Sequence, residues 1–358
     1  MAVETIVIAG GGTGGHLYPG IAIAQELQRR RPALSIVFAG AGRPLERRIV
    51  EEHGYTLLAI ASGGVVGTSI GKRIRGVLRA ALGFFEAMHN LRKLNPKAVI
   101  GVGGYASGPT VAAAVIMRIP TLIQEQNYYP GLTNRLLASW VSRVAISFEE
   151  SRALLGGRGV LTGNPIRGEF HAIGPAPRSG TLRVFVVGGS QGSRAINDAV
   201  IEALPHLASR RAAMRFLHGT GPGDLERVRD AYAAGGFDAD VSDYITDIQA
   251  AYAGAEVVVA RAGAGTVSEL AACGRASILV PLPTAAHDHQ RYNARKLEET
   301  GAAIMLEEKV LSGAALAGTL ISLMNDPERV AAMARAAATL SSPRAAARIA
   351  DLVDEMVA

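Results

Sequence analysis

The chain has 358 residues, more than one ordinary domain, and its 49% hydrophobic and 19% charged residues exclude a disordered or fibrous protein. A single cysteine, Cys273, excludes a disulfide-rich scaffold and suits a reducing compartment, and no apolar run is long enough to cross a bilayer. The net charge of +6 is spread unevenly and predicts an acidic partner. The start of the chain shows no secretory signal, so we expect a protein of the cytosol or of a membrane surface.

The dominant pattern along the chain is a short β-branched run, a glycine-rich turn and a helix of period 3.6. The expected strands are Ile6–Ala9, Ser35–Phe38, Ala98–Val102, Thr121–Ile123, Val144–Ile146, Gly159–Leu161, Leu182–Val187, Ala213–Leu217, Val257–Ala260 and Ser277–Val280. Such alternation is typical of parallel sheets covered by helices on both faces. The sequence therefore predicts the α/β class.

Two of the expected strands are followed by the same kind of glycine turn, which indicates two domains. The first and the seventh expected strands each run into a glycine turn, at 10–15 and at 188–192. We expect two doubly wound Rossmann-like domains facing a cleft, where ligands bind at the carboxyl ends of the strands. The proposed boundaries are 1–164 and 165–342, joined by a stretch rich in proline and glycine, with a terminal helix over 343–358.

The segment 68–97 is strongly basic, with seven lysines and arginines against Glu86 alone. Apolar residues recur there with helical spacing, and Gly76 and Gly83 favour a short helix or a helical hairpin. One interpretation is a surface helix packed on the first sheet; the other is an anchor on anionic lipid. Nucleic acid fits less well, because the aromatic residues do not interleave with the basic ones. The candidate membrane contacts are Lys72, Arg75, Leu78, Arg79, Leu82 and Phe85.

Glycine turns are the main chemical signal. Gly10-x-Gly12-x-x-Gly15 matches the dinucleotide fingerprint, but the second strand ends without the acid that would hold a ribose, which disfavours an NAD(P) enzyme. Four such turns occur, at 10–15, 103–108, 188–192 and 263–266. Backbone amides at helix N-termini attract anions, so the four turns predict phosphate sites, and two separate diphosphates are one arrangement.

Several side chains near these turns carry two interpretations. Thr266 and Glu269 form either a capping box or a helix start whose carboxylate binds a ribose diol. His16 is either an ordinary polar residue at a helix start or a neutral imidazole that accepts a proton. Metal binding is rejected at Asp238–Asp240, which does not follow a hydrophobic strand. It is also rejected at His287–His289, which lacks a third ligand at a recognised spacing.

Taken together in chain order, these motifs resemble one family, the bacterial lipid I N-acetylglucosaminyltransferases of peptidoglycan synthesis. The matching blocks are Gly11–Gly20, Gly103–Pro109, Glu125–Asn127, Gly131–Asn134, Gly163–Arg167, Gly188–Gly192, Arg261–Ala264, Thr266, Ser268–Glu269, His289–Gln290 and Asn293–Ala294. The family often has His where this chain has Gln124, so that position offers no base here.

The resemblance implies a two-domain GT-B glycosyltransferase that is inverting and needs neither metal nor cofactor. It would transfer N-acetylglucosamine from UDP-GlcNAc to the undecaprenyl-diphosphate-linked MurNAc-pentapeptide (lipid I), as a peripheral protein on the cytoplasmic face of the membrane. Its partners would include anionic lipid and no nucleic acid. The open alternatives are another GT-B enzyme, such as a glycolipid glycosyltransferase or a UDP-sugar 2-epimerase, and a non-catalytic UDP-sugar-binding regulator.

The resemblance also assigns roles to residues of this chain. Those on the donor side would be Arg167, Ser190, Ile245, Ala264, Thr266, Glu269, His289, Gln290 and Asn293. Those at the acceptor diphosphate would be Thr13, Gly14, Gly15, Tyr105 and Ser107. The catalytic candidates are His16 as general base, with Asn127 beside it and Glu125 or Tyr105 as the next choice of base.

Overall fold

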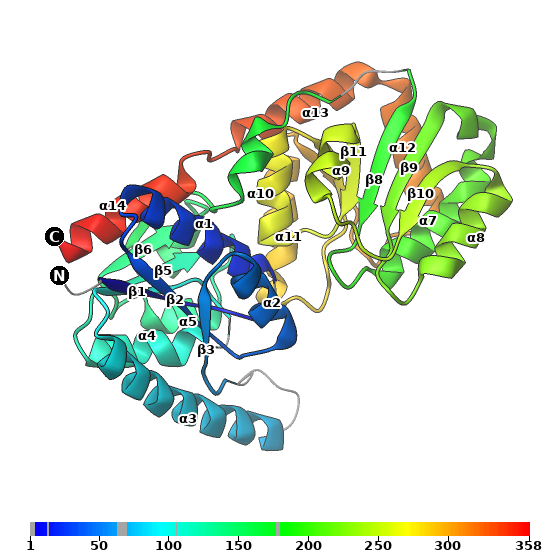
Figure 1. Ribbon diagram of the computed structural model, residues 1–358. Coiled ribbons are helices and arrows are strands. Elements are labelled where there is room, and N and C mark those ends of the chain that lie inside the picture. The colour runs from blue at the N-terminus through cyan, green and yellow to red at the C-terminus, as the bar shows by residue number, and fades with distance from the viewer. Residues whose placement is uncertain (1–3, 13, 63–69, 105, 177–179) are drawn as a thin grey trace. The chain divides into compact units, whose positions relative to one another are not determined.

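The computed structural model describes residues 4–12, 14–62, 70–104, 106–176 and 180–358, and the side chains of 70–75 are not among those described. Its contacts divide the chain into two compact units (Figure 1). The first unit comprises Met1–Arg167 and Ser342–Ala358, and the second comprises Gly168–Ser341. Each unit is built on a parallel sheet with helices on both faces, so the predicted α/β class with two doubly wound domains is confirmed.

The first unit contains a seven-stranded sheet in the order β3-β2-β1-β4-β5-β6-β7. Its strands are β1 (Thr5–Ala9), β2 (Ser35–Gly40), β3 (Thr56–Ala59), β4 (Ala98–Gly101), β5 (Thr121–Glu125), β6 (Arg143–Ile146) and β7 (Gly159–Leu161). The central strands β1 and β4 are almost continuously apolar because helices bury both of their faces.

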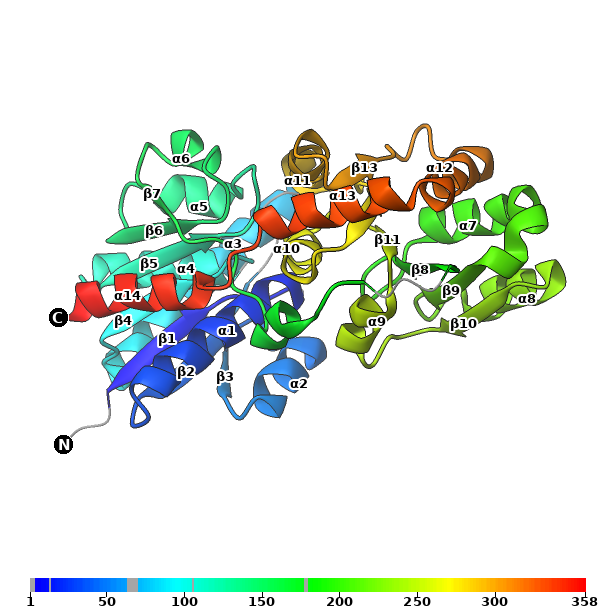
Figure 2. The ribbon, with the colours of Figure 1, turned by 90° about the horizontal axis from the view of Figure 1, so that it is seen from above.

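Helices cover this sheet in two layers (Figure 2). They are α1 (Gly14–Arg30), α2 (Pro44–Glu52), α3 (Ile70–Leu94), α4 (Ser107–Ile116), α5 (Leu132–Leu137), α6 (Ser151–Leu154) and α14 (Ala345–Val357). Helices α3 and α4 share one hydrophobic cluster, whereas α1 and α14 share the other. Arg30 of α1 donates to Asp351 and Asp354 of α14 at 2.7 and 3.0 Å, which ties the end of the chain to its beginning.

The second unit contains a six-stranded sheet in the order β10-β9-β8-β11-β12-β13. Its strands are β8 (Leu182–Val187), β9 (Met214–Gly219), β10 (Asp238–Ser242), β11 (Val257–Ala260), β12 (Ala276–Leu279) and β13 (Ala303–Met305). Its α-helices are α7 (Arg194–Leu207), α8 (Leu225–Gly235), α9 (Ile248–Gly254), α10 (Ala264–Cys273), α11 (His289–Glu299), α12 (Gly313–Asn325) and α13 (Pro327–Thr339). Short 3₁₀ turns lie at η1 (Gly168–Ala172), η2 (Ala208–Ala213) and η3 (Ala286–Asp288).

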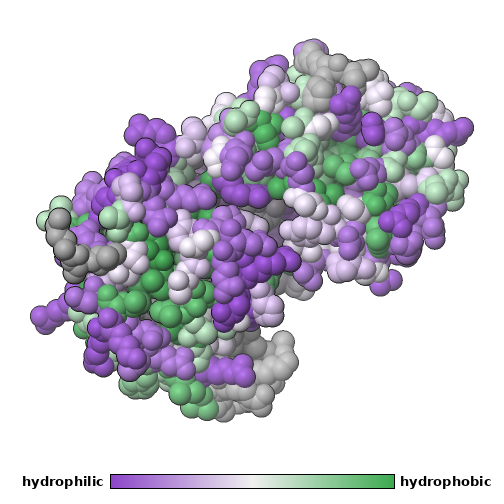
Figure 3. Space-filling model, in the orientation of Figure 1, coloured by the Kyte–Doolittle hydropathy of each residue, from purple (hydrophilic) through white to green (hydrophobic). Residues whose placement is uncertain are grey.

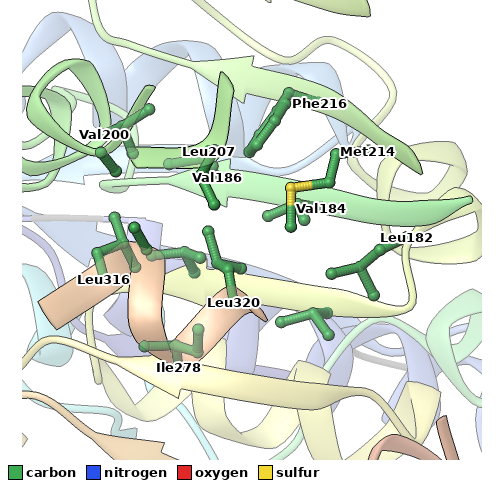
Figure 4. Packing of buried hydrophobic residues seen from close by; sticks show 14 of the residues in the cluster. Leu182, Val184, Val186, Val200, Leu207, Met214, Phe216, Ile278, Leu316 and Leu320 are labelled. Carbon is green, nitrogen blue, oxygen red and sulfur yellow. The ribbon is translucent and has the colours of Figure 1, made fainter. Parts of the chain in front are cut away.

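The core of the second unit follows the period of its strands. Leu182, Val184 and Val186 are alternate residues of β8, so they lie on one face of the sheet. Figure 4 shows them among Leu316 and Leu320 of α12, and all five belong to one buried cluster. This packing holds the carboxyl end of β8, from which a glycine turn follows.

Two details of the sequence-based expectation need correction. The strands β3, β10 and β13 were not predicted, because they are short and lack a β-branched run; β10 reads Asp-Ala-Asp-Val-Ser. The expected short helix or hairpin in the basic segment is wrong, because α3 is one continuous helix. Gly83 serves close packing there, since a Cβ at that position would collide with the Ala61 carbonyl. Within the described ranges, we find no helix with both the length and the apolar character needed to cross a membrane.

Arg275, immediately before β12, is completely buried, and its partners among the described residues are backbone carbonyl groups. Its guanidinium donates to the carbonyls of Tyr252, Ala253, Cys273, Gly274 and Gly174. Burial lowers the pKa of Arg275. The side chain joins the ends of α9 and α10 to the segment that enters the second unit, so it stabilises that unit from within.

Replacing Arg275 with methionine should lower the free energy of unfolding by about 3 kcal/mol or more, because several buried carbonyls lose their donors. Urea denaturation followed by circular dichroism measures this loss. Arg229→Met is the matched control, since Arg229 is exposed and pairs with Glu226 in its own helix; its effect should stay within about 0.5 kcal/mol. Equal midpoints for the two variants would contradict the assignment.

Candidate functional site

Each unit places two of the glycine turns side by side. The turns at 10–15 and 103–108 follow β1 and β4, which pair with each other, and those at 188–192 and 263–266 follow β8 and β11, which also pair. At these positions the strand order reverses, and doubly wound sheets bind their ligands there. In the first unit the two turns touch, because a Cβ at Gly104 would collide with the backbone of Gly11.

A buried carboxylate supports the first glycine turn. Glu46 of α2 is only 1% exposed, and its carboxylate accepts hydrogen bonds from the backbone N–H groups of Gly12 at 2.6 Å and Arg43 at 3.2 Å. One amide of the turn is therefore already bound within the protein. Gly14 and Gly15 begin α1, so their amides belong to its open N-terminal turn. Thr13 and Tyr105 lie outside the described residues.

His16 stands in the first turn of α1, against the second glycine turn. Its Nδ1 lies 3.2 Å from the carbonyl oxygen of Val102. A carbonyl only accepts, so Nδ1 carries the hydrogen and Nε2 carries the lone pair. The same carbonyl accepts a hydrogen bond of 2.7 Å from Nε2 of Gln126. The end of β4 thus sets both the orientation and the tautomer of His16.

Glu125, at the end of β5, is buried and organises the turn that follows it. Its carboxylate accepts hydrogen bonds of 2.9 to 3.2 Å from the backbone N–H groups of Asn127 and Gly131 and from the side chains of Asn127 and Asn134. These four donors occupy both carboxylate oxygens. The arrangement explains why Glu125 and Asn127 lie together, and it describes a rigid turn better than a base.

Two further positions of the first unit face inward. Ser107 begins α4, but its hydroxyl is buried beneath β4, where a Cβ at Gly101 would lie 2.7 Å from it. Gln124 is also buried, and its amide nitrogen lies 3.3 Å from Oδ1 of Asn164. Arg167 places its guanidinium 4.8 Å from the centre of the Tyr18 ring, so it belongs to the first unit.

In the second unit, Ser190 and Ile245 lie at the carboxyl ends of neighbouring strands. Ser190 is exposed in the turn after β8, and the helix α7 that follows is capped by Ser193, which accepts from the N–H of Ile196. Ile245 packs at the end of β9, where a Cβ on Gly219 would lie 2.8 Å from its side chain. An apolar side chain and a polar turn therefore occupy adjacent places at one sheet edge.

Glu269 lies in α10, and a buried tyrosine orients it. The hydroxyl of Tyr252 donates to Oε2 of Glu269 at 3.1 Å. Of the two interpretations of Thr266 and Glu269, the capping box is wrong, because the N-cap of α10 is Gly263 and Thr266 lies inside the first helical turn. Ala264 and Thr266 thus contribute backbone amides to that turn.

The α11 side chains support the turn after β11. Oε1 of Gln290 accepts from the N–H groups of Ala262 at 3.2 Å and Leu282 at 3.0 Å. Asn293 is completely buried and donates to the Ala262 carbonyl at 3.1 Å. His289 places Nδ1 2.7 Å from the Ala286 carbonyl. Gln290 and Asn293 therefore fix the backbone from which α10 begins.

Sequence inspection missed side chains that hold the site together, notably Glu46 and Tyr252. Each is far in sequence from the group it binds, and no local pattern marks it. Among the residues whose placement is described, no three histidine, cysteine, aspartate or glutamate side chains gather as a metal site would require. Asp238 and Asp240 lie in the edge strand β10, paired in register with Arg215 and Leu217.

The chain matches two family models, the glycosyltransferase family 28 N-terminal domain over residues 6–146 and the family 28 C-terminal domain over residues 183–349. A curated UDP-N-acetylglucosamine–N-acetylmuramyl-(pentapeptide) pyrophosphoryl-undecaprenol N-acetylglucosamine transferase from Anaeromyxobacter dehalogenans is 46% identical, covering 98% of this chain and 93% of its own. The protein of the same name from Myxococcus xanthus is 45% identical with the same coverage. The crystal structure of Acinetobacter baumannii MurG matches with a TM-score of 0.79 at 28% identity, covering 98% of this chain and 99% of its own.

Proposed function

Because the chain belongs to glycosyltransferase family 28, among its pyrophosphoryl-undecaprenol N-acetylglucosamine transferases, we propose that it transfers GlcNAc from UDP-GlcNAc to the 4-hydroxyl of the MurNAc-pentapeptide of lipid I, giving lipid II. The observation that carries this proposal is the 46% identity over 98% of the chain. The paired glycine turns at the reversal point of each sheet support it, because each pair offers helix N-termini to a diphosphate.

We assign the donor nucleotide to the second unit. Ile245 lies against the uracil, and Glu269, oriented by Tyr252, accepts hydrogen bonds from the ribose hydroxyls. Ser190 and the first turns of α7 and α10 face the diphosphate. Gln290 and Asn293 act on the sugar mainly through the backbone of Ala262, which they hold; His289 lies at the start of the same helix.

We assign the acceptor to the first unit, with its diphosphate at the N-termini of α1 and α4. The 4-hydroxyl oxygen forms a bond to the anomeric carbon from the face opposite UDP, so the configuration inverts. The bond from that carbon to the UDP oxygen breaks, and its electron pair leaves with UDP. The hydroxyl proton passes to Nε2 of His16, whose tautomer is set by the Val102 carbonyl. Glu125 is the weaker choice of base, because four internal donors already occupy it.

An assay of acceptor-dependent UDP release tests the reaction. We expect UDP to form only when UDP-GlcNAc and a short-chain lipid I analogue are both present, with a disaccharide product seen by mass spectrometry and equal rates with and without EDTA. A UDP-sugar 2-epimerase would consume UDP-GlcNAc without acceptor, and a regulator would bind it without turnover. Either of those outcomes would refute the proposed transfer.

We propose that α3 holds the protein on the cytoplasmic face of the membrane. Val77, Leu78, Leu82 and Phe85 of this helix are large apolar residues exposed by 55 to 66%. Arg79 is exposed beside them, whereas the side chains of Lys72 and Arg75 lie outside those described. Figure 3 shows groups of hydrophobic side chains next to hydrophilic ones along the lower edge of the first unit, where α3 runs. Apolar side chains interleaved with cations suit an anionic lipid surface.

Replacing Leu82 and Phe85 with serine should reduce binding to vesicles containing phosphatidylglycerol by about tenfold or more. Each apolar side chain that becomes buried in the lipid contributes roughly 1.5–3 kcal/mol to the free energy of binding. Cosedimentation measures binding, and turnover with a soluble acceptor should remain unchanged. Val310→Ser is the control, since Val310 is 57% exposed but lies in the second unit. Equal binding by the double variant and the control would exclude α3 as the anchor.

A further inference from the structure

A buried polar chain lies behind the glycine turn of the second unit, and it takes no part in the transfer described above. His218, near the end of β9, is completely buried. Its Nε2 lies 3.0 Å from Oδ1 of Asn197 in α7, and its Nδ1 lies 3.3 Å from the hydroxyl of Tyr232 in α8. The imidazole therefore joins the sheet to the two helices on that face.

The partners of Asn197 determine where the hydrogens lie. Its amide nitrogen is 2.9 Å from both the Thr220 carbonyl and Oδ2 of Asp224, and these two groups accept. The amide oxygen must then face His218, so Nε2 of His218 carries the hydrogen and Nδ1 accepts from Tyr232. Every hydrogen bond in this series is therefore donated in the same direction, from Tyr232 through His218 and Asn197 to Thr220 and Asp224.

The charge states of the two titratable groups agree with this direction. Burial lowers the pKa of His218 to about 3, against a small opposing effect of Asp224, so the imidazole is neutral. Although burial opposes it, hydrogen bonds from Asn197 and Arg227 lower the pKa of Asp224, which is therefore ionised and only accepts. The chain keeps its hydrogen-bond pattern throughout the neutral range.

Thr220, at the accepting end of this hydrogen-bond chain, contacts the glycine turn itself. A Cβ at Gly192 would collide with the Thr220 carbonyl, and a Cβ at Gly221 would collide with the Gln191 carbonyl. The 188–192 turn and the turn after β9, at 220–221, are therefore in direct backbone contact. Both glycines also have positive φ, of 74° and 79°. Asn197 also stands in the first turns of α7, whose N-terminus follows the glycine turn. Holding Thr220 therefore holds the 188–192 turn against α7.

We propose that His218 and Asn197 are positioning residues for the donor diphosphate: they hold the 188–192 turn and the start of α7 in the geometry that binds it. The inference rests on the proposed function in assigning a nucleoside diphosphate to this turn. Neither side chain touches the ligand. Their loss should therefore weaken contacts to the phosphates and leave those to the nucleoside intact.

Isothermal titration with UDP and with uridine tests the inference on the full chain. His218→Leu removes the donor to Asn197 and should weaken UDP binding by about tenfold while changing uridine binding less than about twofold. His218→Gln places an amide N–H near the position of Nε2 and should restore most of the UDP affinity. Tyr232→Phe is the matched control, because it breaks the chain beyond His218 and should lower thermal stability without affecting UDP selectively.

Kinetics add a second measurement, and a second variant covers poor folding. His218→Leu should raise the KM for UDP-GlcNAc about tenfold and leave the KM for acceptor unchanged. If this variant does not fold, Asn197→Ser tests the same link from α7 and should show the same selective loss for UDP. Wild-type affinity for UDP in either folded variant, or equal losses for UDP and uridine, would overturn the inference.

The two proposals fail in different ways. If the wild-type protein shows no acceptor-dependent turnover but His218→Leu still loses UDP selectively, the transfer reaction is wrong and the positioning role stands. If the wild-type protein turns over and His218→Leu binds UDP normally, the positioning role alone is wrong.

Discussion

Replacing His16 with alanine should lower kcat by about 10²–10⁴-fold, the usual contribution of a general base. The hydrogen bond from Nδ1 to the Val102 carbonyl places the hydrogen on Nδ1 and the lone pair on Nε2. We assign Nε2 as the atom that accepts the proton of the attacking hydroxyl, and alanine removes it. Steady-state rates with UDP-GlcNAc and a soluble lipid I analogue measure the effect. The KM for UDP-GlcNAc should change little, because we assign the nucleotide to the other unit.

The pH dependence separates a base from a residue that only shapes the turn. A base acts in its neutral form, so the wild-type kcat/KM should fall as pH decreases and the imidazole becomes protonated, whereas the variant should lack that decrease. His53→Ala is the matched control, because His53 also binds a carbonyl of the first unit, that of Ile49, at 2.7 Å. If turnover of the His16 variant stays within a few-fold of wild type at all pH values, His16 is not the base.

Replacing Glu269 with alanine should raise the KM for UDP-GlcNAc by about 10²-fold. Hydrogen bonds to a charged group contribute roughly 1.5–3 kcal/mol each, and we expect the carboxylate to accept two from the ribose. Tyr252→Phe should have a smaller effect of about tenfold or less, since it removes only the hydrogen bond that orients Oε2.

A substrate analogue tests the ribose contact directly. The wild-type protein should discriminate against the 2′-deoxyribose form of UDP-GlcNAc, and the Glu269 variant should use both donors almost equally. A thermal melt checks that the fold is intact. Undiminished discrimination in the variant would show that Glu269 does not bind the ribose, and its bond to Tyr252 would then be purely structural.

The fold class could be predicted because its signals are local. β8 reads Leu-Arg-Val-Phe-Val-Val and ends in a glycine turn, and this combination marks a buried parallel strand wherever it occurs. β10 escaped detection because an edge strand needs little apolar surface, and its identity depends on pairing with β9. The length of α3 was also misjudged, because the cost of Gly83 in a helix is offset by close packing against Ala61.

The candidate site likewise contains residues that the sequence could predict and residues that it could not. The glycine turns and His16 could be proposed from the sequence because they are adjacent residues directly after a strand. The carboxylate that binds Gly12 lies 34 residues away, and the tyrosine hydroxyl that binds Glu269 lies 17 residues away. Nothing local distinguishes such side chains from surface residues. The capping interpretation of Thr266 fails for a related reason: the backbone path before α10, and not the residue type, decides where the helix begins.

The return of α14 to the first unit has a consequence for biosynthesis. Ile349, Leu352 and Val353 complete the hydrophobic cluster that α1 forms over the first sheet, so one face of that sheet is left incompletely covered until the ribosome has added these residues. The second unit is continuous in sequence and can mature earlier, although it is translated later than most of the first. A nascent chain would thus expose the apolar face of α1 and the first sheet until α14 has been synthesised.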